Sequence, residues 1–260
     1  MTVNSPTILA LDFDGVICDG LIEYFEVAWR TYCQIWTSAN DTPPDDLALR
    51  FYRLRPVIET GWEMPVLIKA LINGFSDDKI LQDWVNITPA ILTADHLEAK
   101  EIMKKLDGLR DKWIETDLDG WLSLHKFYPG VIEKLKITLA SGVKLYIVTT
   151  KEGRFVKQLL QQEGVNLPDT AIFGKEVKRP KYQTLRELIA KAESKPVRLW
   201  FVEDRLKTLE LVKQQSDLKD VQLFLADWGY NTQPEREAGQ NDNRIRVISL
   251  DQFSQDFSHW

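Results

Sequence analysis

The sequence predicts an α/β protein with a doubly wound, mostly parallel sheet and a second, all-helical domain inserted after the first strand. Two observations predict this fold class. Strand-sized apolar runs alternate with amphipathic segments in the second half of the chain, a pattern typical of a parallel sheet covered by helices. The first run is separated from the next by about 130 residues, far more than one crossover needs, which indicates an insertion.

Four apolar or β-branched runs, each ending on a polar residue, are the main predicted strands. Continuous runs of this kind are typical of strands buried on both faces. They lie at 7–13, 143–150, 197–204 and 221–227, with shorter candidates at 171–173 and 244–250. Helical spacing marks the segments expected to cover them, at 130–140, 154–163, 182–192 and 206–214. The polar stretch 233–243 is expected to be a surface loop.

Residues 19–126 are expected to form the helical domain, and residues 1–18 and 127–260 the α/β core domain. Apolar residues recur at steps of three and four in every segment of the insertion that we expect to be helical. These segments are 21–36, 45–60, 65–73, 77–85 and 94–116. Ser76, and Thr93 before residues 94–96, are the expected helix caps.

Composition excludes several classes of protein. The 260 residues are 44% hydrophobic and carry a formal charge of -6, so the chain is globular and is not expected to bind nucleic acid. No apolar stretch is long enough to span a membrane, and the start of the chain does not resemble an export signal. Cys18 and Cys33 are expected to be buried thiols in a reducing compartment, which favours a cytoplasmic location.

Polar side chains follow three of the predicted strands, where ligands bind in open α/β sheets. They are Asp12, Thr149 with Thr150, and Glu203 with Asp204. Asp12 and Asp14 also form an i, i+2 pair on one face of a strand, and Gly15 permits a tight turn directly after it. One carboxylate could then attack while the other handles protons. The alternative is that these acids only solvate a loop or cap the next element.

The chain resembles the haloacid dehalogenase-like superfamily of phosphohydrolases, in the branch with a helical C1-type cap. The matching motifs occur in the expected order: LDFDGVICDG at 11–20, FYPGV at 127–131, LYIVTTK at 145–151, KRPKYQTL at 178–185 and WFVEDRLKTLE at 200–210. The resemblance covers the core domain and implies a Rossmann-like core; the inserted helices match only in location. It implies a cap that closes over small substrates and excludes water.

The resemblance also implies roles for the first motif. Asp12 would be the nucleophile that forms an aspartyl-phosphate, and a ligand of Mg²⁺. Asp14 would be the general acid and base, and its backbone carbonyl would be a further metal ligand. Asp14 argues against dehalogenation, because the dehalogenases of the family lack an aspartate at this position. Gly15 counts among the phosphate-binding residues.

The second and third motifs imply the remaining phosphate-binding groups. Thr149 would donate its hydroxyl to a phosphoryl oxygen, with Thr150 taking this role if the register differs by one residue. Lys181 would neutralise charge beside the nucleophile. Lys178 is the competitor, because some relatives place the lysine earlier in the motif.

The fourth motif implies the rest of the metal site, at Asp204 and Glu203. It departs from the common pattern, since the fourth and fifth residues after Asp204 are Thr208 and Leu209 rather than an acid. The Glu203-Asp204 doublet resembles the paired-acid variant, with Glu203 acting directly or through water.

The expected function is therefore Mg²⁺-dependent hydrolysis of a small phosphorylated metabolite. A phosphomutase on the same scaffold is one alternative, and a catalytically weak binding or regulatory protein is another. Side chains of the helical domain would select the substrate; the candidates are Arg30, Arg53, Arg55, Glu59 and Trp62.

Overall fold

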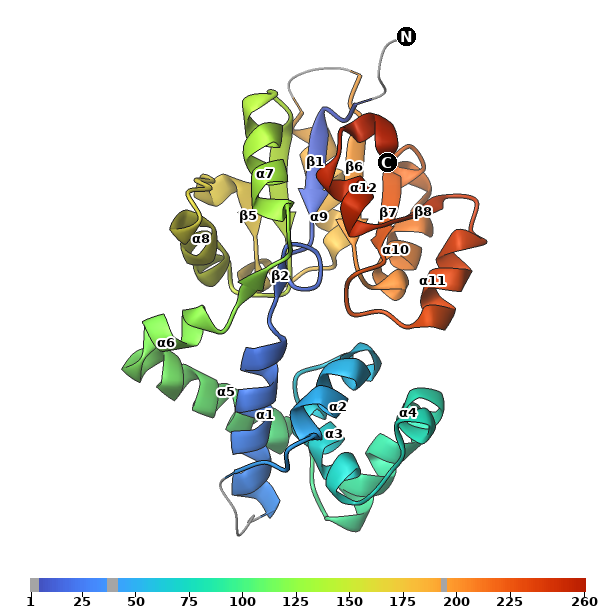
Figure 1. Ribbon diagram of the computed structural model, residues 1–260. Coiled ribbons are helices and arrows are strands. Elements are labelled where there is room, and N and C mark those ends of the chain that lie inside the picture. Colours follow the sequence, from blue (N-terminus) through green and yellow to red (C-terminus); the bar gives the residue numbers. More distant parts are fainter. Residues whose placement is uncertain (1–4, 37–41, 193–195) are drawn as a thin grey trace. The chain divides into compact units, whose positions relative to one another are not determined.

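The computed structural model of the protein describes residues 5–36, 42–192 and 196–260 (Figure 1). The chain divides into two compact units. One comprises residues 1–19 and 126–260, and the other is Gly20–His125. The second unit is thus inserted into the sequence of the first.

The first unit is built on a six-stranded parallel sheet with the order β5-β4-β1-β6-β7-β8. Its strands are β1 (Ile8–Leu11), β4 (Lys144–Val148), β5 (Ile172–Phe173), β6 (Leu199–Glu203), β7 (Gln222–Ala226) and β8 (Ile245–Ile248). Each lies inside a predicted strand, so the predicted fold class is confirmed. A separate antiparallel pair, β2 (Cys18–Asp19) and β3 (Lys126–Phe127), lies where the chain leaves this unit and returns.

Helices cover both faces of the sheet, as the unbroken apolar runs predict. They are α7 (Val131–Ala140), α8 (Gly153–Gln162), α9 (Lys181–Ala190), α10 (Leu206–Lys213), α11 (Gln233–Gln240) and α12 (Leu250–Ser254). Alternate strand residues point to opposite faces: Phe201 packs with residues of α9 and α10, whereas Trp200 contacts Phe257 and Trp260. Figure 1 shows α7 and α12 on one face and α9 on the other.

The polar stretch 233–243 is not a loop, so that prediction was wrong. Residues Gln233–Gln240 form α11, which begins with a capping box. The hydroxyl of Thr232 accepts the N–H of Glu235, and the Glu235 carboxylate accepts the N–H of Thr232. These bonds satisfy backbone donors of the first turn, and they stabilise a helix that has little apolar surface.

The second unit is helical throughout its described elements. These are α1 (Leu21–Trp36), α2 (Leu47–Leu54), the short 3₁₀ helix η1 (Arg55–Val57), α3 (Glu63–Ile72), α4 (Asp77–Ala94), α5 (Ala99–Thr116) and α6 (Leu118–Ser123). Ser76 caps α4, because its hydroxyl accepts the N–H of Lys79 at 3.3 Å. The predicted cap at Thr93 was wrong: α4 runs on past residue 85 with Pro89 inside it, so Thr93 lies in its last turn, and Glu98 precedes α5.

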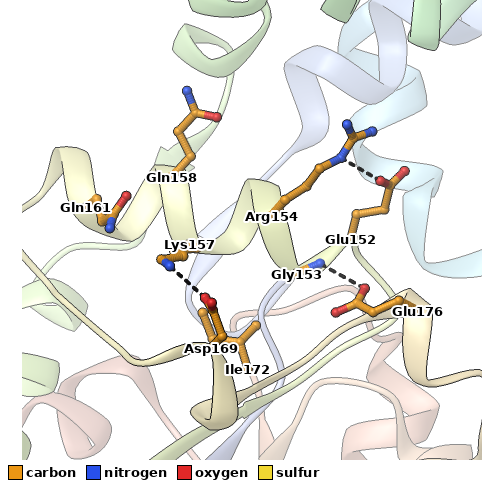
Figure 2. Close-up of a pocket in the computed structure, with 9 residues that line it drawn as sticks. All are labelled: Glu152, Gly153, Arg154, Lys157, Gln158, Gln161, Asp169, Ile172 and Glu176. Atoms are coloured by element: carbon orange, nitrogen blue, oxygen red, sulfur yellow. Dashed lines mark hydrogen bonds and ion pairs between the residues drawn. The ribbon is translucent and has the colours of Figure 1, made fainter.

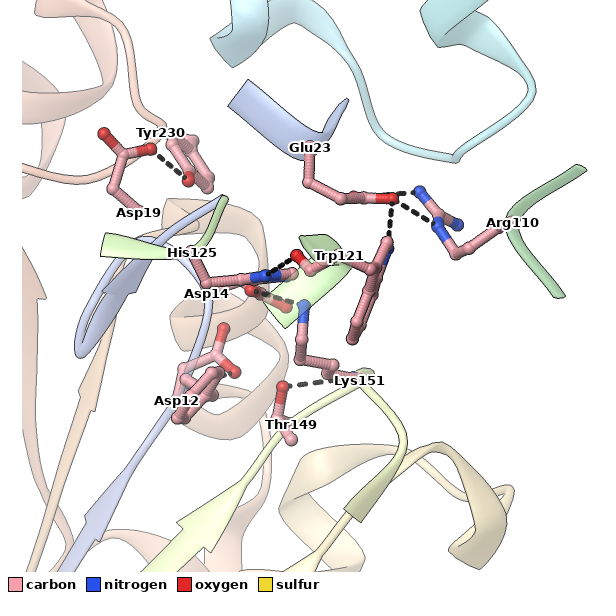
Figure 3. A network of polar contacts seen from close by, with 11 residues as sticks. Asp12, Asp14, Asp19, Glu23, Arg110, Trp121, His125, Thr149, Lys151 and Tyr230 are labelled. Carbon is pink, nitrogen blue, oxygen red and sulfur yellow. Dashed lines mark hydrogen bonds and ion pairs between the residues drawn. The ribbon is translucent and has the colours of Figure 1, made fainter. Parts of the chain in front are cut away.

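A buried acid joins three of these helices. Glu23 accepts hydrogen bonds from Arg110 at 2.8 Å and from the indole of Trp121 at 3.1 Å (Figure 3). Because a buried charge is stable only when it is paired, this contact fixes α1 against α5 and α6. None of the described helices is long and apolar enough to cross a membrane. Cys18 is buried and Cys33 half-buried, and neither is in a disulfide.

Candidate active site

The carboxyl ends of neighbouring strands bring the candidate site residues together. Asp12 follows β1, Thr149 follows β4, and Asp204 follows β6, whose last residue is Glu203. Parallel pairing of β1 with both β4 and β6 places these ends at one edge of the sheet. This is where ligands bind in doubly wound sheets.

Asp12 is a buried carboxylate held in one orientation. Its Oδ1 accepts the backbone N–H of Phe13 at 2.7 Å and contacts Lys181 Nζ at 2.8 Å. Burial raises the pKa of Asp12 to about 7, and the charge of Glu203 adds to the rise while Lys181 opposes it.

Glu203 and Asp204 lie beside Asp12 and are fully buried. Each of the three acids offers an oxygen, and these oxygens lie within 4.8 Å of one another. Burial, followed by the charge of Asp12, raises the pKa of Asp204 to about 6. Burial also raises the pKa of Glu203. Three buried carboxylates at this spacing repel one another, and hard oxygen donors of this kind suit a divalent cation such as Mg²⁺. The residues present therefore fit a metal site.

Lys181, at the start of α9, lies between two of these acids. Its Nζ is 2.8 Å from Asp12 Oδ1 and 2.7 Å from Glu203 Oε2. Burial alone would lower the pKa of Lys181, but the two carboxylates raise it, so the side chain is charged. Lys178, the competing candidate, has a left-handed backbone (φ 49°) and is exposed.

Gly15 makes the turn that follows the first acid possible. Its φ is +85°, and a Cβ there would lie 2.2 Å from Asp204 Oδ2. The turn closes through its N–H to the carbonyl of Cys18 at 2.8 Å. Asp14 projects to a different partner from Asp12, because its Oδ1 lies 3.2 Å from Lys151 Nζ (Figure 3). Among the described residues, its carboxylate is not part of the three-acid cluster.

Thr149 is buried at the end of β4, and Thr150 is exposed. The N–H of Lys151 donates to Thr149 Oγ1 at 3.2 Å, and the N–H of Thr149 donates to the carbonyl of Phe173. The first of these bonds occupies a lone pair of the hydroxyl, so its proton points elsewhere and can be donated.

Sequence reasoning missed the loop after β7. The N–H of Tyr230 donates to Asp204 Oδ2 at 2.7 Å, and its phenol donates to Asp19 at 2.9 Å. Asn231 donates to the carbonyl of Asp204 at 2.9 Å. A Cβ at Gly229 would lie 2.3 Å from that of Asp204. The available signal was the position of this loop, at the carboxyl end of a fourth predicted strand. Lys151 is the last residue of the motif at 145–151, and nothing in that motif predicted a role for it.

Three of the candidate specificity residues, Arg30, Arg53 and Arg55, have partners inside the helical unit. Arg30 lies over the ring of Trp113 at 3.9 Å, and Arg53 pairs with Asp77 at 3.0 Å. Arg55 donates to the carbonyl of Ile58 at 3.0 Å. These contacts stabilise the helices, and selection of a substrate by these residues stays a prediction.

A concave surface lies away from the acidic cluster, along α8. This groove of about 720 Å³ is lined by charged and amide side chains (Figure 2). Its charges are paired locally, Lys157 with Asp169 at 2.6 Å and Arg154 with Glu152 at 2.8 Å. None of the predicted catalytic residues lines it.

Comparison with known proteins gives a family and a fold. The model of the haloacid dehalogenase-like hydrolase family matches residues 74–214, more than half of the chain. A search of curated proteins finds no match.

Solved structures match almost the whole chain at low identity. A predicted phosphoglycolate phosphatase from Haemophilus somnus 129pt has 16% identity and a TM-score of 0.61, covering 97% of this chain and 95% of its own. A haloacid dehalogenase-like hydrolase from Streptococcus pneumoniae has 15% identity and a TM-score of 0.56, and the match covers 96% of this chain and 95% of that protein. Protein Tyrosine Kinase A from Mycobacterium tuberculosis has 14% identity and a TM-score of 0.55, and the match covers 95% of this chain and 96% of that protein. The shared fold therefore does not by itself decide the activity.

Proposed function

Because the chain belongs to the haloacid dehalogenase-like hydrolase family, we propose that it is a Mg²⁺-dependent phosphatase that acts on a small phosphomonoester through an aspartyl-phosphate on Asp12. The observation that carries the proposal is the contact of Asp12 with Lys181 at 2.8 Å, inside a cluster of three buried acids. A nucleophilic carboxylate, a charged lysine and a set of hard oxygen donors are the groups that phosphoryl transfer needs.

In the first step, an oxygen of the Asp12 carboxylate attacks phosphorus, and the bond from phosphorus to the ester oxygen breaks. That oxygen keeps the electron pair and takes a proton from the carboxyl group of Asp14, so an alcohol leaves. Lys181 and the hydroxyl of Thr149 stabilise the negative charge on the phosphoryl oxygens. Bound Mg²⁺, held by Asp12, Asp204, Glu203 and the backbone carbonyl of Asp14, would supply further positive charge to those oxygens.

In the second step, water attacks the phosphorus of the aspartyl-phosphate and gives a proton to the Asp14 carboxylate. The bond from phosphorus to Asp12 breaks, and its electron pair returns to the Asp12 carboxylate. The products of the cycle are an alcohol and inorganic phosphate, and both aspartates return to their starting protonation. Asp14 is the residue that separates this reaction from dehalogenation, because the ester oxygen needs a proton to leave.

The departure of the fourth motif from the family pattern is compatible with this chemistry. Leu209 packs in the core of the α/β unit. Glu203 takes the place of the later acid that many relatives have in the fourth motif, because its carboxylate lies in the cluster with Asp12 and Asp204.

The test is phosphate release from a panel of sugar, nucleotide, glycolate and aryl phosphates, with Mg²⁺ and with a chelator. Asp12→Asn should abolish turnover, and Asp14→Asn should lower kcat by about 10²- to 10⁴-fold while metal binding is retained. Asp220→Asn, at an exposed position, is the matched control and should be fully active. Full activity in Asp12→Asn contradicts the mechanism. If no substrate of the panel releases phosphate while the protein is folded and binds Mg²⁺, a phosphomutase or a binding role is favoured.

A further inference from the structure

A second lysine, Lys151, lies at the candidate site and has no role in the mechanism above. It follows β4 by three residues, and only 10% of its side chain is exposed. Its Nζ is 3.2 Å from Oδ1 of Asp14, whose own side chain is 18% exposed (Figure 3). A lysine this enclosed loses hydration, and an opposite charge at hydrogen-bond distance offsets that loss.

Asp12 and Asp14 therefore each contact a different lysine. Lys181 contacts Asp12 at 2.8 Å, and Lys151 contacts Asp14 at 3.2 Å. Lys181 is the first residue of α9, and Lys151 lies in the loop between β4 and α8, so the two acids are oriented independently. This arrangement separates the group that attacks phosphorus from the group that moves protons.

The backbone of Lys151 is fixed as well as its side chain. Its N–H donates to Thr149 Oγ1 at 3.2 Å, across the turn that follows β4. Thr149 is itself tied to the carbonyl of Phe173 on the neighbouring strand. The backbone of Lys151 is thus held against the sheet through Thr149, and its ammonium group reaches the loop that carries Asp14. A proton-transfer group has to be held within a fraction of an ångström to act efficiently.

We propose that Lys151 is a positioning residue that holds Asp14 for both of its proton transfers; this inference rests on the phosphatase activity proposed above. In the first transfer the protonated form of Asp14, which still accepts the ammonium N–H through Oδ1, gives its proton to the departing ester oxygen. In the second transfer the Asp14 carboxylate takes a proton from the attacking water. Loss of the lysine side chain leaves Asp12, Lys181 and Thr149 in place, but Asp14 is no longer aimed at either oxygen.

The test uses the different need of two leaving groups for a proton. An alkyl phosphate must have its leaving oxygen protonated, whereas 4-nitrophenyl phosphate releases a stable anion without one. In Lys151→Met, kcat/KM for an alkyl phosphate should fall by about tenfold or more. The value for 4-nitrophenyl phosphate should stay within about threefold of the wild type, because kcat/KM reports only the first step. The second step still needs Asp14, so aspartyl-phosphate should accumulate during turnover of the aryl substrate.

Matched variants separate positioning from a general disturbance. Lys151→Arg keeps the charge and should restore most of the alkyl activity. Lys157→Met removes an ammonium group that also pairs with an aspartate, Asp169 at 2.6 Å, but lies outside the site; it should behave as the wild type. If Lys151→Met does not fold, Lys151→Gln gives the same comparison.

Two results would overturn the inference. Equal losses of kcat/KM for alkyl and aryl phosphates, without accumulation of aspartyl-phosphate, would mean that Lys151 binds the phosphoryl group directly. Unchanged kinetics in Lys151→Met would mean that the ion pair has no role in the reaction. Neither result touches the proposed function, which depends on the comparison of the wild type with Asp12→Asn.

Discussion

Replacing Asp204 by asparagine should stabilise the metal-free protein while it abolishes activity. Asp204 is fully buried next to Asp12, and burial followed by the charge of Asp12 raises its pKa from 3.8 to about 6. A rise of one pKa unit is worth about 1.4 kcal/mol in favour of the neutral form. Keeping Asp204 charged in the folded state therefore costs about 3 kcal/mol, and asparagine removes this cost.

The sign of the pH dependence follows from the proton that the folded protein retains. Between pH 3.8 and about 6 the folded state keeps this proton and the unfolded chain has released it. Stability therefore falls as the pH rises through that window, and the whole cost is present above it. The variant should gain about 3 kcal/mol at about pH 8 and about 1.5 kcal/mol at about pH 5, where the folded side chain keeps its proton but the unfolded one has already released it.

The assay is urea unfolding of both proteins in chelator at the two pH values, followed by the same measurement with Mg²⁺. Added Mg²⁺ should stabilise the wild type and have little effect on Asp204→Asn, because a ligand stabilises only the state that binds it. Asp220→Asn should change stability by less than about 0.5 kcal/mol under every condition. A variant that is less stable than the wild type at about pH 8, or that gains equally at both pH values, would show that burial does not destabilise the charged form of Asp204.

Three further changes test the surroundings of the site. Gly15→Ala should cost about 1–2 kcal/mol from its backbone angle of +85° alone, and should impair catalysis because the new Cβ would lie 2.2 Å from Asp204 Oδ2; urea unfolding and phosphate release measure the two effects. Tyr230→Phe removes the 2.9 Å bond to Asp19, so it should cost about 1 kcal/mol and speed amide hydrogen exchange at residues 18–19. Thr232→Ala removes the cap of α11 and should lower stability by about 1 kcal/mol with kcat unchanged.

The controls and contrary outcomes are specific to each change. Gly142 has a similar φ of +81°, but a Cβ there would meet none of the described residues within 4 Å, so Gly142→Ala should lose stability and keep full activity. Full activity in Gly15→Ala would mean that the approach to Asp204 is unimportant. Unaltered exchange in Tyr230→Phe would show that the phenol does not hold residues 18–19. A loss of kcat in Thr232→Ala would place α11 closer to the chemistry than its contacts indicate.

Local patterns in the sequence were sufficient for the fold. The apolar runs at 7–13 and 197–204 contain β1 and β6, because a strand covered on both faces must be apolar throughout. The helix at 233–240 was missed for the opposite reason: it is polar, and it has too few apolar side chains to mark a buried face. Its capping box, Thr232 with Glu235, was the readable local signal.

The lysine beside Asp12 could not be identified from local sequence alone. Motif spacing left Lys178 and Lys181 as competitors. The structure puts Lys181 at the first position of α9, with Nζ 2.8 Å from Asp12, whereas Lys178 is exposed in a left-handed conformation before the helix. The start of the helix determines which of two nearby lysines faces the sheet edge, and helix boundaries are the least certain part of any sequence-based assignment.

The sheet, the insertion and the polar groups at the strand ends could all be predicted from the sequence, because side-chain period and apolar content are local properties of the chain. The pairing of those polar groups could be seen only in the folded structure. Lys151 meets Asp14 across 137 positions of sequence, and Tyr230 meets Asp204 across 26. Such pairs depend on which strands are neighbours in the sheet and on how tightly the loops pack above their ends, and neither is encoded in the periodicity of any one segment.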